Sequence, residues 1–312
     1  MTSKAEKIKE LALEAGFVKA GIAVSEPLEP EGFRLREWLR ARFHGEMAWM
    51  EREPEKRMDP RAIYPEARSV LVVAMNYFTP HEHEPGNGKI SRYAWGDDYH
   101  DIVRERLKLL LERIRVEFEG ADGKICVDTA PVMDKAWAVR AGIGWQGKHS
   151  NIINPDIGSW FFIGEILLNI DLEHHDDAMP DHCGTCTACL DACPTTAIVE
   201  PYVVDSNKCI SYATIELRTP ELPDVVSENL NGWLYGCDIC QDVCPWNRFG
   251  KPTLETRFEP RMGETSIGPD MVLSLTPETY AERFRRSAIK RAKISGLQRN
   301  ARYLGSTDDD SL

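Results

Sequence analysis

The sequence lacks an apolar run long enough to cross a bilayer. Its most hydrophobic stretch, WFFIGEILLNI (160–170), is interrupted by Glu165, and it is far shorter than the roughly 20 apolar residues of a transmembrane helix. The first residues, MTSKAEKIKELALEAGF, carry a charge every few positions and lack the apolar core of a signal peptide. These absences predict a cytoplasmic protein that does not associate with membranes.

An overall excess of positive charge is also missing. The 312 residues carry a formal net charge of −12, which argues against broad, non-specific binding to nucleic acid. The charge is unevenly distributed, however, because residues 281–304 hold many basic side chains and only Glu282 as an acidic one. The basic residues are Arg283, Arg285, Arg286, Lys290, Arg291, Lys293, Arg299 and Arg302. This segment is either a solvated helix face or a binding site for a localised anionic partner.

Internal repeats and low-complexity tracts are absent as well, and 312 residues suit about two domains. Hydrophobic periodicity predicts alternating helices and strands over residues 1–175, and therefore a layered α/β or α+β domain. We expect helices over 4–14, 31–50 (with a break near Gly45), 97–119 and 132–142, and strands over 17–24, 68–78, 123–131 and 159–170. A charged segment with Pro180 marks the end of this domain.

Cysteine is plentiful, with nine residues, and most of them are clustered. In a reducing cytosol, clustered cysteines are more often metal ligands than disulfides. The stretch DHCGTCTACLDACP spaces its four cysteines as C-x2-C-x2-C-x3-C-P. This spacing is typical of ferredoxins with two [4Fe–4S] clusters, in which the fourth cysteine binds the other cluster. The stretch is therefore half of a unit.

The other half lies downstream, in GCDICQDVCPWN and NKCISYATIE. In such modules, the fourth cysteine of each motif binds the cluster of the other motif. This pattern predicts one cluster on Cys183, Cys186, Cys189 and Cys244, and a second cluster on Cys193, Cys209, Cys237 and Cys240. Cys126 is left over and is expected to be a small buried hydrophobe. A pair of zinc sites is the alternative, although zinc prefers two separated C-x2-C pairs.

Two carboxylates precede this module at positions that core packing does not explain. Asp128 ends a predicted strand, and Asp134 begins a predicted helix. The two could face one cavity, and burial could make one of them a proton donor. The alternatives are a turn or N-cap role for Asp128 and a favourable interaction with the helix dipole for Asp134.

Eight motifs occur in an order that resembles the epoxyqueuosine reductases, over about residues 50–302. They are EKRMDPR, ISRYAWGDDYH, VDTAPVMDKAWAVRAGIGWQGKHS, INPDIGSWFFIGEILLN, CGTCTACLDACPTTAI, CISYATIE, GCDICQDVCPWN and AIKRAKISGLQRNA. The resemblance implies an α+β protein made of three parts: a cobalamin-binding domain (1–175), a ferredoxin-like module with two clusters (176–250) and a short, helical, basic tail (251–312).

The resemblance also implies the reaction. The family uses base-off cobalamin, recharged through two [4Fe–4S] clusters, to reduce epoxyqueuosine to queuosine at the wobble position of tRNAs for His, Asp, Asn and Tyr. Asp134 would be the proton donor beside the cobalt. The residues that would line the cofactor are Arg57, Asp134, Gly158, Ser159, Asn169 and Ser211. The sequence has no D-x-H-x-x-G box, since DYHDIV has valine where glycine is required, which agrees with a base-off cofactor.

The basic segment then has a candidate partner. We expect Arg285, Arg286, Lys290 and Arg291, lying along a helix, to contact tRNA phosphates, with Arg218 nearby. The protein is expected to act as a monomer and to receive electrons from a low-potential donor. Two other functions remain open at this point: another corrinoid iron–sulfur reductase, resembling the reductive dehalogenases, or a non-catalytic electron carrier.

Overall fold

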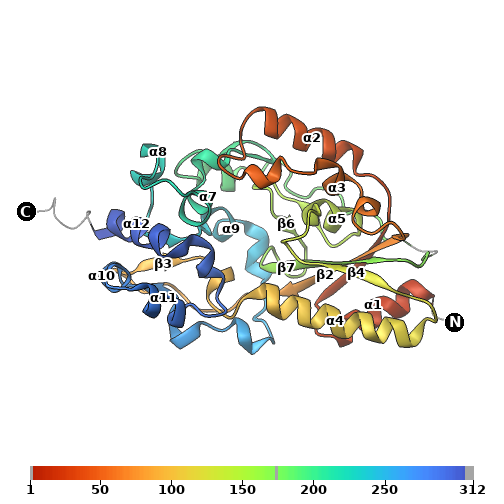
Figure 1. Ribbon diagram of the computed structural model, residues 1–312. Coiled ribbons are helices and arrows are strands. Elements are labelled where there is room, and N and C mark those ends of the chain that lie inside the picture. Colours follow the sequence, from red (N-terminus) through yellow and green to blue (C-terminus); the bar gives the residue numbers. More distant parts are fainter. Residues whose placement is uncertain (1–2, 173–174, 306–312) are drawn as a thin grey trace, which may run out of the picture.

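A computed structural model describes residues 3–172 and 175–305. The N-terminal part is built on a four-stranded antiparallel sheet in the order β1-β2-β7-β4 (Figure 1). The strands are β1 (Lys19–Val24), β2 (Ser69–Asn76), β7 (Phe161–Leu168) and β4 (Gly123–Cys126). Each lies inside a segment predicted to be a strand, so the sequence periodicity located the sheet correctly.

Helices cover both faces of this sheet. In β2, Leu71 and Val73 belong to one hydrophobic core and Val70 and Val72 to the other, as expected when successive side chains point to opposite faces. Helices α1 (Lys4–Glu14) and α4 (Tyr99–Glu117) pack on the first core, whereas α5 (Asp134–Arg140) packs on the second. Figure 1 places α2 (Glu29–Arg40) and α3 (Pro54–Met58) on the same side of the sheet as α5.

Local sequence explains where these helices begin and end. Ser3 and Glu6 form a capping box at the start of α1, and Asp98 caps α4 by accepting a hydrogen bond from the backbone of His100. The helix expected to continue to Gly45 instead ends at Arg40, because Arg42 adopts a left-handed backbone conformation with φ of 57°.

The cysteine-rich module contains short elements joined by tight turns. They are α6 (Ala188–Asp191), β8 (Ile198–Glu200), β9 (Val203–Val204), α7 (Ile210–Ile215), α8 (Asp224–Ser227), β10 (Trp233–Tyr235) and α9 (Ile239–Asp242). Helices α6 and α9, each lying within one of the cysteine motifs, pack against each other. The two halves of the double motif are therefore neighbours in space.

The C-terminal part joins the other two through a second sheet. This sheet has the order β10-β3-β11, where β3 (Gly88–Ile90) comes from the N-terminal part and β11 (Ser266–Ile267) from the tail. The remaining elements of the tail are α10 (Pro269–Leu273), α11 (Pro277–Arg283), the 3-10 helix η8 (Ala288–Ala292) and α12 (Lys293–Gly305). The end of the chain with its three aspartates lies outside the described residues.

None of the helices within 3–172 and 175–305 combines the length and the apolar composition that a membrane crossing requires.

Candidate active site and cluster-binding module

Asp134 stands at the first position of α5, against the second core of the sheet. Its Oδ1 is buried and, the neighbouring Glu165 carboxyl apart, has no hydrogen-bond partner in the described part of the chain. Burial raises the pKa of Asp134 to about 6; the hydrogen bond with Glu165 opposes this rise, and the charge of Asp128 adds to it. A carboxyl group with such a pKa is able to act as a proton donor near neutral pH.

Glu165 is a second carboxyl beside Asp134, and sequence reasoning did not identify it as functional. It lies in the middle of β7 and is 0% exposed, and the Asp134 carboxyl apart, its carboxyl oxygens have no hydrogen-bond partner among the described residues. Burial, and then the charge of Asp134, raise its pKa well above the ordinary value. The signal in the sequence was a single acidic residue in an otherwise apolar strand.

Asp128 is held by a histidine that the sequence analysis also overlooked. His100 lies 2.7 Å from Asp98 through Nδ1 and 3.0 Å from Asp128 through Nε2. Burial lowers the pKa of His100, but its hydrogen bonds to Asp128 and Asp98 outweigh this and raise the pKa to about 9. His100 thereby links the start of α4 to the loop that leads to Asp134.

Arg57, in α3, lies near Asp134. It donates a hydrogen bond of 3.2 Å to the carbonyl oxygen of Trp49, and its guanidinium lies 5.5 Å from the centroid of the Trp49 ring. Burial lowers its pKa, which the charge of Asp134 partly offsets, and its Nε is buried without a partner in the described structure. Arg57 thus has an unused donor close to the candidate acid.

Gly158 and Ser159 lie where the N-terminal part meets the cluster module. The Oδ1 of Asn247 accepts a hydrogen bond of 2.6 Å from the backbone of Ser159, and Gln241 donates one of 3.0 Å to the Ser159 hydroxyl. Gly158 has a φ of 71°, and a Cβ there would come within 2.3 Å of Asn247 Oδ1. These two residues therefore form a close contact with the segment around Cys240 and Cys244.

Asn169 is not brought together with the other candidates. It follows the opposite end of β7 from Ser159, and this eight-residue strand is about 26 Å long. Its amide nitrogen donates to Gly120 at 3.0 Å, and its Oδ1 accepts from Asp122 at 2.7 Å. Its side chain closes the turn between α4 and β4.

The eight motif cysteines fall into two spatial groups. Cys183 and Cys244 pack in one hydrophobic cluster with Trp145 and Trp246, while Cys209 and Cys237 pack in another. Electrostatic interactions among the thiols join Cys183, Cys186, Cys189 and Cys244, and likewise Cys193, Cys209, Cys237 and Cys240. A further interaction, between Cys240 and Cys189, crosses between the two groups, so the assignment of four cysteines to each cluster stays a prediction.

Neighbouring groups support both sets of thiols. Lys148 donates to the carbonyl oxygens of Gly184 at 2.7 Å and Cys186 at 2.9 Å, which fixes the first cysteine loop to the N-terminal part. The backbone N–H groups of Ser211 and Tyr212 point to the Cys209 thiol and favour its thiolate, although burial raises its pKa overall. Ser211 therefore lies beside the Cys209 thiol.

A site for a single metal ion needs closer ligands than a site for a four-iron cluster. Over the described ranges, no three His, Cys, Asp or Glu side chains converge as ligands of one metal ion. A four-iron cube is larger than one ion and spaces its four thiolate ligands more widely.

The basic segment does not form one continuous helical stripe, which corrects the expectation from the sequence. Arg299, in α12, is only 2% exposed, because its guanidinium donates to the carbonyl oxygens of Ala213 (2.6 Å) and of Leu217 and Thr219 (both 3.0 Å). The next residue, Asn300, donates to Thr214 and Leu234 at 2.9 Å. This pair secures the tail to α7 and β10.

Other basic residues remain on the surface. Arg285 and Lys290 are exposed, and Arg286 lies 3.2 Å from Asp101. Arg291 makes two hydrogen bonds of 2.7 Å to Glu216, and its charge reaches Asp128. Arg218 donates to the carbonyl oxygens of Ile215 at 2.8 Å and Arg291 at 2.7 Å, so it joins α7 to η8.

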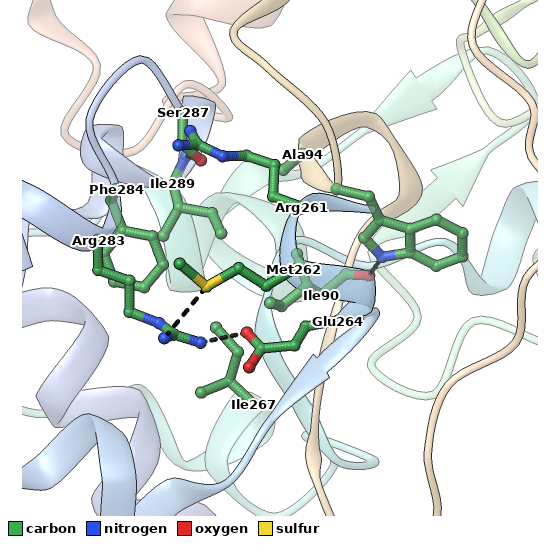
Figure 2. A pocket seen from close by; sticks show the side chains of 11 residues that line it. Ile90, Ala94, Arg261, Met262, Glu264, Ile267, Arg283, Phe284, Ser287 and Ile289 are labelled. Carbon is green, nitrogen blue, oxygen red and sulfur yellow. Dashed lines mark hydrogen bonds and ion pairs between the residues drawn. The ribbon is translucent and has the colours of Figure 1, made fainter. Parts of the chain in front are cut away.

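A small cavity of about 30 Å³ lies where the tail packs on residues 90–95 (Figure 2). Arg283 pairs there with Glu264 and lies 3.7 Å from the Met262 sulfur. The volume suits about one water molecule. None of the predicted site residues lines this cavity, and it is not part of the candidate active site.

Similarity to known proteins decides the family. Residues 57–129 match the model described as "Epoxyqueuosine reductase QueG, DUF1730", and residues 182–247 match the "4Fe-4S double cluster binding domain". A protein of Cellulophaga algicola named epoxyqueuosine reductase is 46% identical over 95% of this chain and 96% of its own. The chain belongs to the epoxyqueuosine reductase family. The family member from Synechocystis sp. is 48% identical over 90% of this chain and 98% of its own.

Solved epoxyqueuosine reductases share the fold. One, crystallised with an epoxyqueuosine-modified stem loop of tRNA-Tyr, has a TM-score of 0.89 and 31% identity, and covers 96% of this chain and 80% of its own. Another, from Bacillus subtilis, has a TM-score of 0.87 with the same identity and coverage. It is described with "the Asp134 catalytic loop swung out of the active site". The mixed α+β fold and the iron–sulfur module predicted from the sequence are therefore confirmed.

Proposed function

We propose that this protein reduces epoxyqueuosine to queuosine in tRNA, the last step of queuosine biosynthesis. The observation that carries the proposal is the buried carboxyl of Asp134, whose pKa is raised to about 6, in a member of the epoxyqueuosine reductase family. Removal of the epoxide oxygen consumes two electrons and two protons, leaves an alkene and releases water. Asp134 protonates the departing oxygen.

The cofactor proposed for this site is base-off cobalamin. Arg57 Nε and, the Glu165 carboxyl apart, Asp134 Oδ1 are buried polar atoms without partners in the described structure, so the residues present suit a large polar ligand between them. When bound, cobalamin supplies a low-potential cobalt centre that acts at carbon. Gly158, Ser159 and Ser211 complete the proposed lining. We leave Asn169 out, because it lies at the other end of β7.

The two groups of thiols hold the two [4Fe–4S] clusters in this proposal. The group that contains Cys209 lies nearer the candidate acid, since Cys209 and Cys240 both act on the pKa of Lys135, the neighbour of Asp134. The group that contains Cys186 includes an exposed cysteine. It therefore receives electrons from the low-potential donor and passes them inward.

The test of the reaction is the variant Asp134→Asn. Asparagine keeps the size of the side chain but holds no transferable proton. We expect full iron content and cobalamin binding, and a loss of about 10²–10⁴-fold in queuosine formation, measured by nucleoside mass spectrometry. Wild-type turnover in the variant would contradict the role of Asp134.

The proposed RNA partners are the tRNAs for His, Asp, Asn and Tyr. Arg285 and Lys290 are exposed on the tail, and Arg286 is close to them in sequence. Reversal of these three charges to glutamate should weaken tRNA binding and flatten its dependence on salt concentration. The matched control reverses Arg34, Arg36 and Arg40, which are exposed on α2. Equal affinities for the two triple variants would exclude the tail as the RNA contact.

Two alternatives have distinct outcomes. A non-catalytic electron carrier would reduce an acceptor but show no cobalamin spectrum after anaerobic reconstitution. Another corrinoid reductase would bind cobalamin but leave epoxyqueuosine in tRNA unchanged. Formation of queuosine by the reconstituted wild-type protein excludes both. We further propose that the protein works in the cytoplasm as a monomer.

A further inference from the structure

Glu165 occupies the least accessible part of the sheet that supports the active site. It lies on β7, between Val72 of β2 and Cys126 of β4, and on the same face as Phe161 and Leu167, which pack toward α5. This alternation along the strand directs its carboxyl toward the start of α5, where Asp134 stands. The two carboxyls hydrogen-bond to each other, and beyond this pairing the oxygens of Glu165 and Oδ1 of Asp134 are buried without partners in the described structure.

This arrangement has no evident structural purpose. A buried polar group that lacks hydrogen bonds costs about 1–3 kcal/mol, and an apolar residue would suit this strand better. The groups that raise the pKa of Glu165 after burial itself are the carboxyls of Asp134 and Asp128, and the Cys126 thiol across the strand pair also interacts with Glu165. Glu165 therefore holds a proton more tightly than an ordinary glutamate does.

The reaction requires that second proton. Conversion of an epoxide into an alkene and water takes two protons, whereas Asp134 holds only one at a time. Water reaches Glu165 poorly, because the side chain is 0% exposed. A proton on Glu165 is consequently available to Asp134 and exchanges only slowly with solvent.

We propose that Glu165 is the proton store of the active site and acts through Asp134. This inference rests on the proposed function. After Asp134 has given its proton to the departing oxygen, the O–H bond of Glu165 breaks and an O–H bond forms on the Asp134 carboxylate. Asp134 then protonates the same oxygen again, and water leaves. The two protons come from the carboxyl pair and the two electrons from the clusters, and solvent restores both protons afterwards.

The first experiment uses Glu165→Gln, which keeps the shape and neutrality of the protonated side chain but has no proton to transfer. We expect unchanged iron content, cobalamin affinity and tRNA affinity, with a single-turnover rate at pH 8 at least about 100-fold below wild type. The rate should recover toward wild type near pH 6, where solvent reprotonates Asp134 directly. A variant with the wild-type rate and pH profile would overturn the proposal.

The second experiment requires no turnover. Infrared spectroscopy of the wild-type protein at pH 8 should show the carbonyl band of a buried, protonated carboxyl, which Glu165→Gln removes and Asp134→Asn retains. Absence of this band in the wild type would overturn the proposal, even if Glu165→Gln failed to fold. Failure of the wild type to form queuosine would instead refute the proposed function, so the two failures are distinguishable.

Discussion

At the scale of single residues, the position of Asp134 depends on His100. Asp128 has a φ of 50°, a left-handed conformation that is strained for a residue with a side chain, and His100 holds its carboxylate at 3.0 Å. The loop that begins at Asp128 carries the chain to Asp134, only six residues further on. The bond to His100 thus restrains the loop on which the candidate acid depends.

We therefore expect His100→Gln to loosen this loop. Because the pKa of His100 is raised from 6.5 to about 9, its contribution to the free energy of unfolding is present below about pH 6.5 and is lost as the pH rises through about 9. Hydrogen exchange of residues 127–133 should be faster in the variant at pH 7, and wild type and variant should converge above pH 9. His81→Gln, which removes an exposed histidine 2.7 Å from Glu259, is the control and should leave the loop unchanged.

At the scale of elements, the turn before β7 meets the cluster module at Gly158, where there is no room for a side chain. Gly158 has a left-handed φ of 71° and lies directly against Asn247, the third residue after Cys244. Any Cβ there would push the segment around Asn247 away from Ser159. The fit between the two parts of the protein is thus sensitive to one methyl group.

Gly158→Ala should consequently lower the free energy of unfolding by more than backbone strain alone, which is of order 1–3 kcal/mol. The comparison is Gly120→Ala, because Gly120 has a φ of 77° but nothing within 4 Å of the position of a Cβ. Denaturant unfolding of both variants measures the difference. Equal destabilisation would mean that Asn247 moves aside freely.

At the scale of the whole molecule, the three predicted segments are interwoven. Strand β3 from the N-terminal part pairs with β10 of the module and with β11 of the tail. The two cysteine motifs are also interwoven: Cys244 of the second motif lies with the cysteines of the first, and Cys193 of the first motif lies with those of the second. Long-range connections of this kind make folding of one segment depend on the others.

Cys244→Ser should remove only the cluster assigned to Cys183, Cys186, Cys189 and Cys244. Iron per chain is expected to fall from about eight to about four, while the cluster on the second group keeps its electron paramagnetic resonance signal. Cys126→Ser is the matched control and should retain all of the iron, because Cys126 lies on β4 away from both groups. Loss of both signals in Cys244→Ser would contradict the independence of the two sites.

Sequence reasoning succeeded where the signal is local. Periodicity located the sheet and its helices, and cysteine spacing predicted the double-cluster iron–sulfur module. Sequence reasoning failed for Arg299, which it placed among the surface charges. A guanidinium with five N–H donors can be buried when several carbonyl oxygens surround it. Only the tertiary structure reveals these carbonyl partners. Glu165 and His100 escaped notice for the same reason, since their meaning depends on partners far away in the sequence.

The crossing of the cysteine motifs also has a consequence for the newly made chain. Cys193 and Cys244 are 51 positions apart, which corresponds to roughly 3–10 s of synthesis at about 5–20 residues per second. During that interval, the ribosome has released three thiols of the first group without their fourth partner. Neither cluster can be completed until the second motif has emerged. The iron–sulfur assembly machinery must therefore act on a nearly finished polypeptide, and premature termination before Cys237 would leave the five module cysteines already made without a complete ligand set for either cluster.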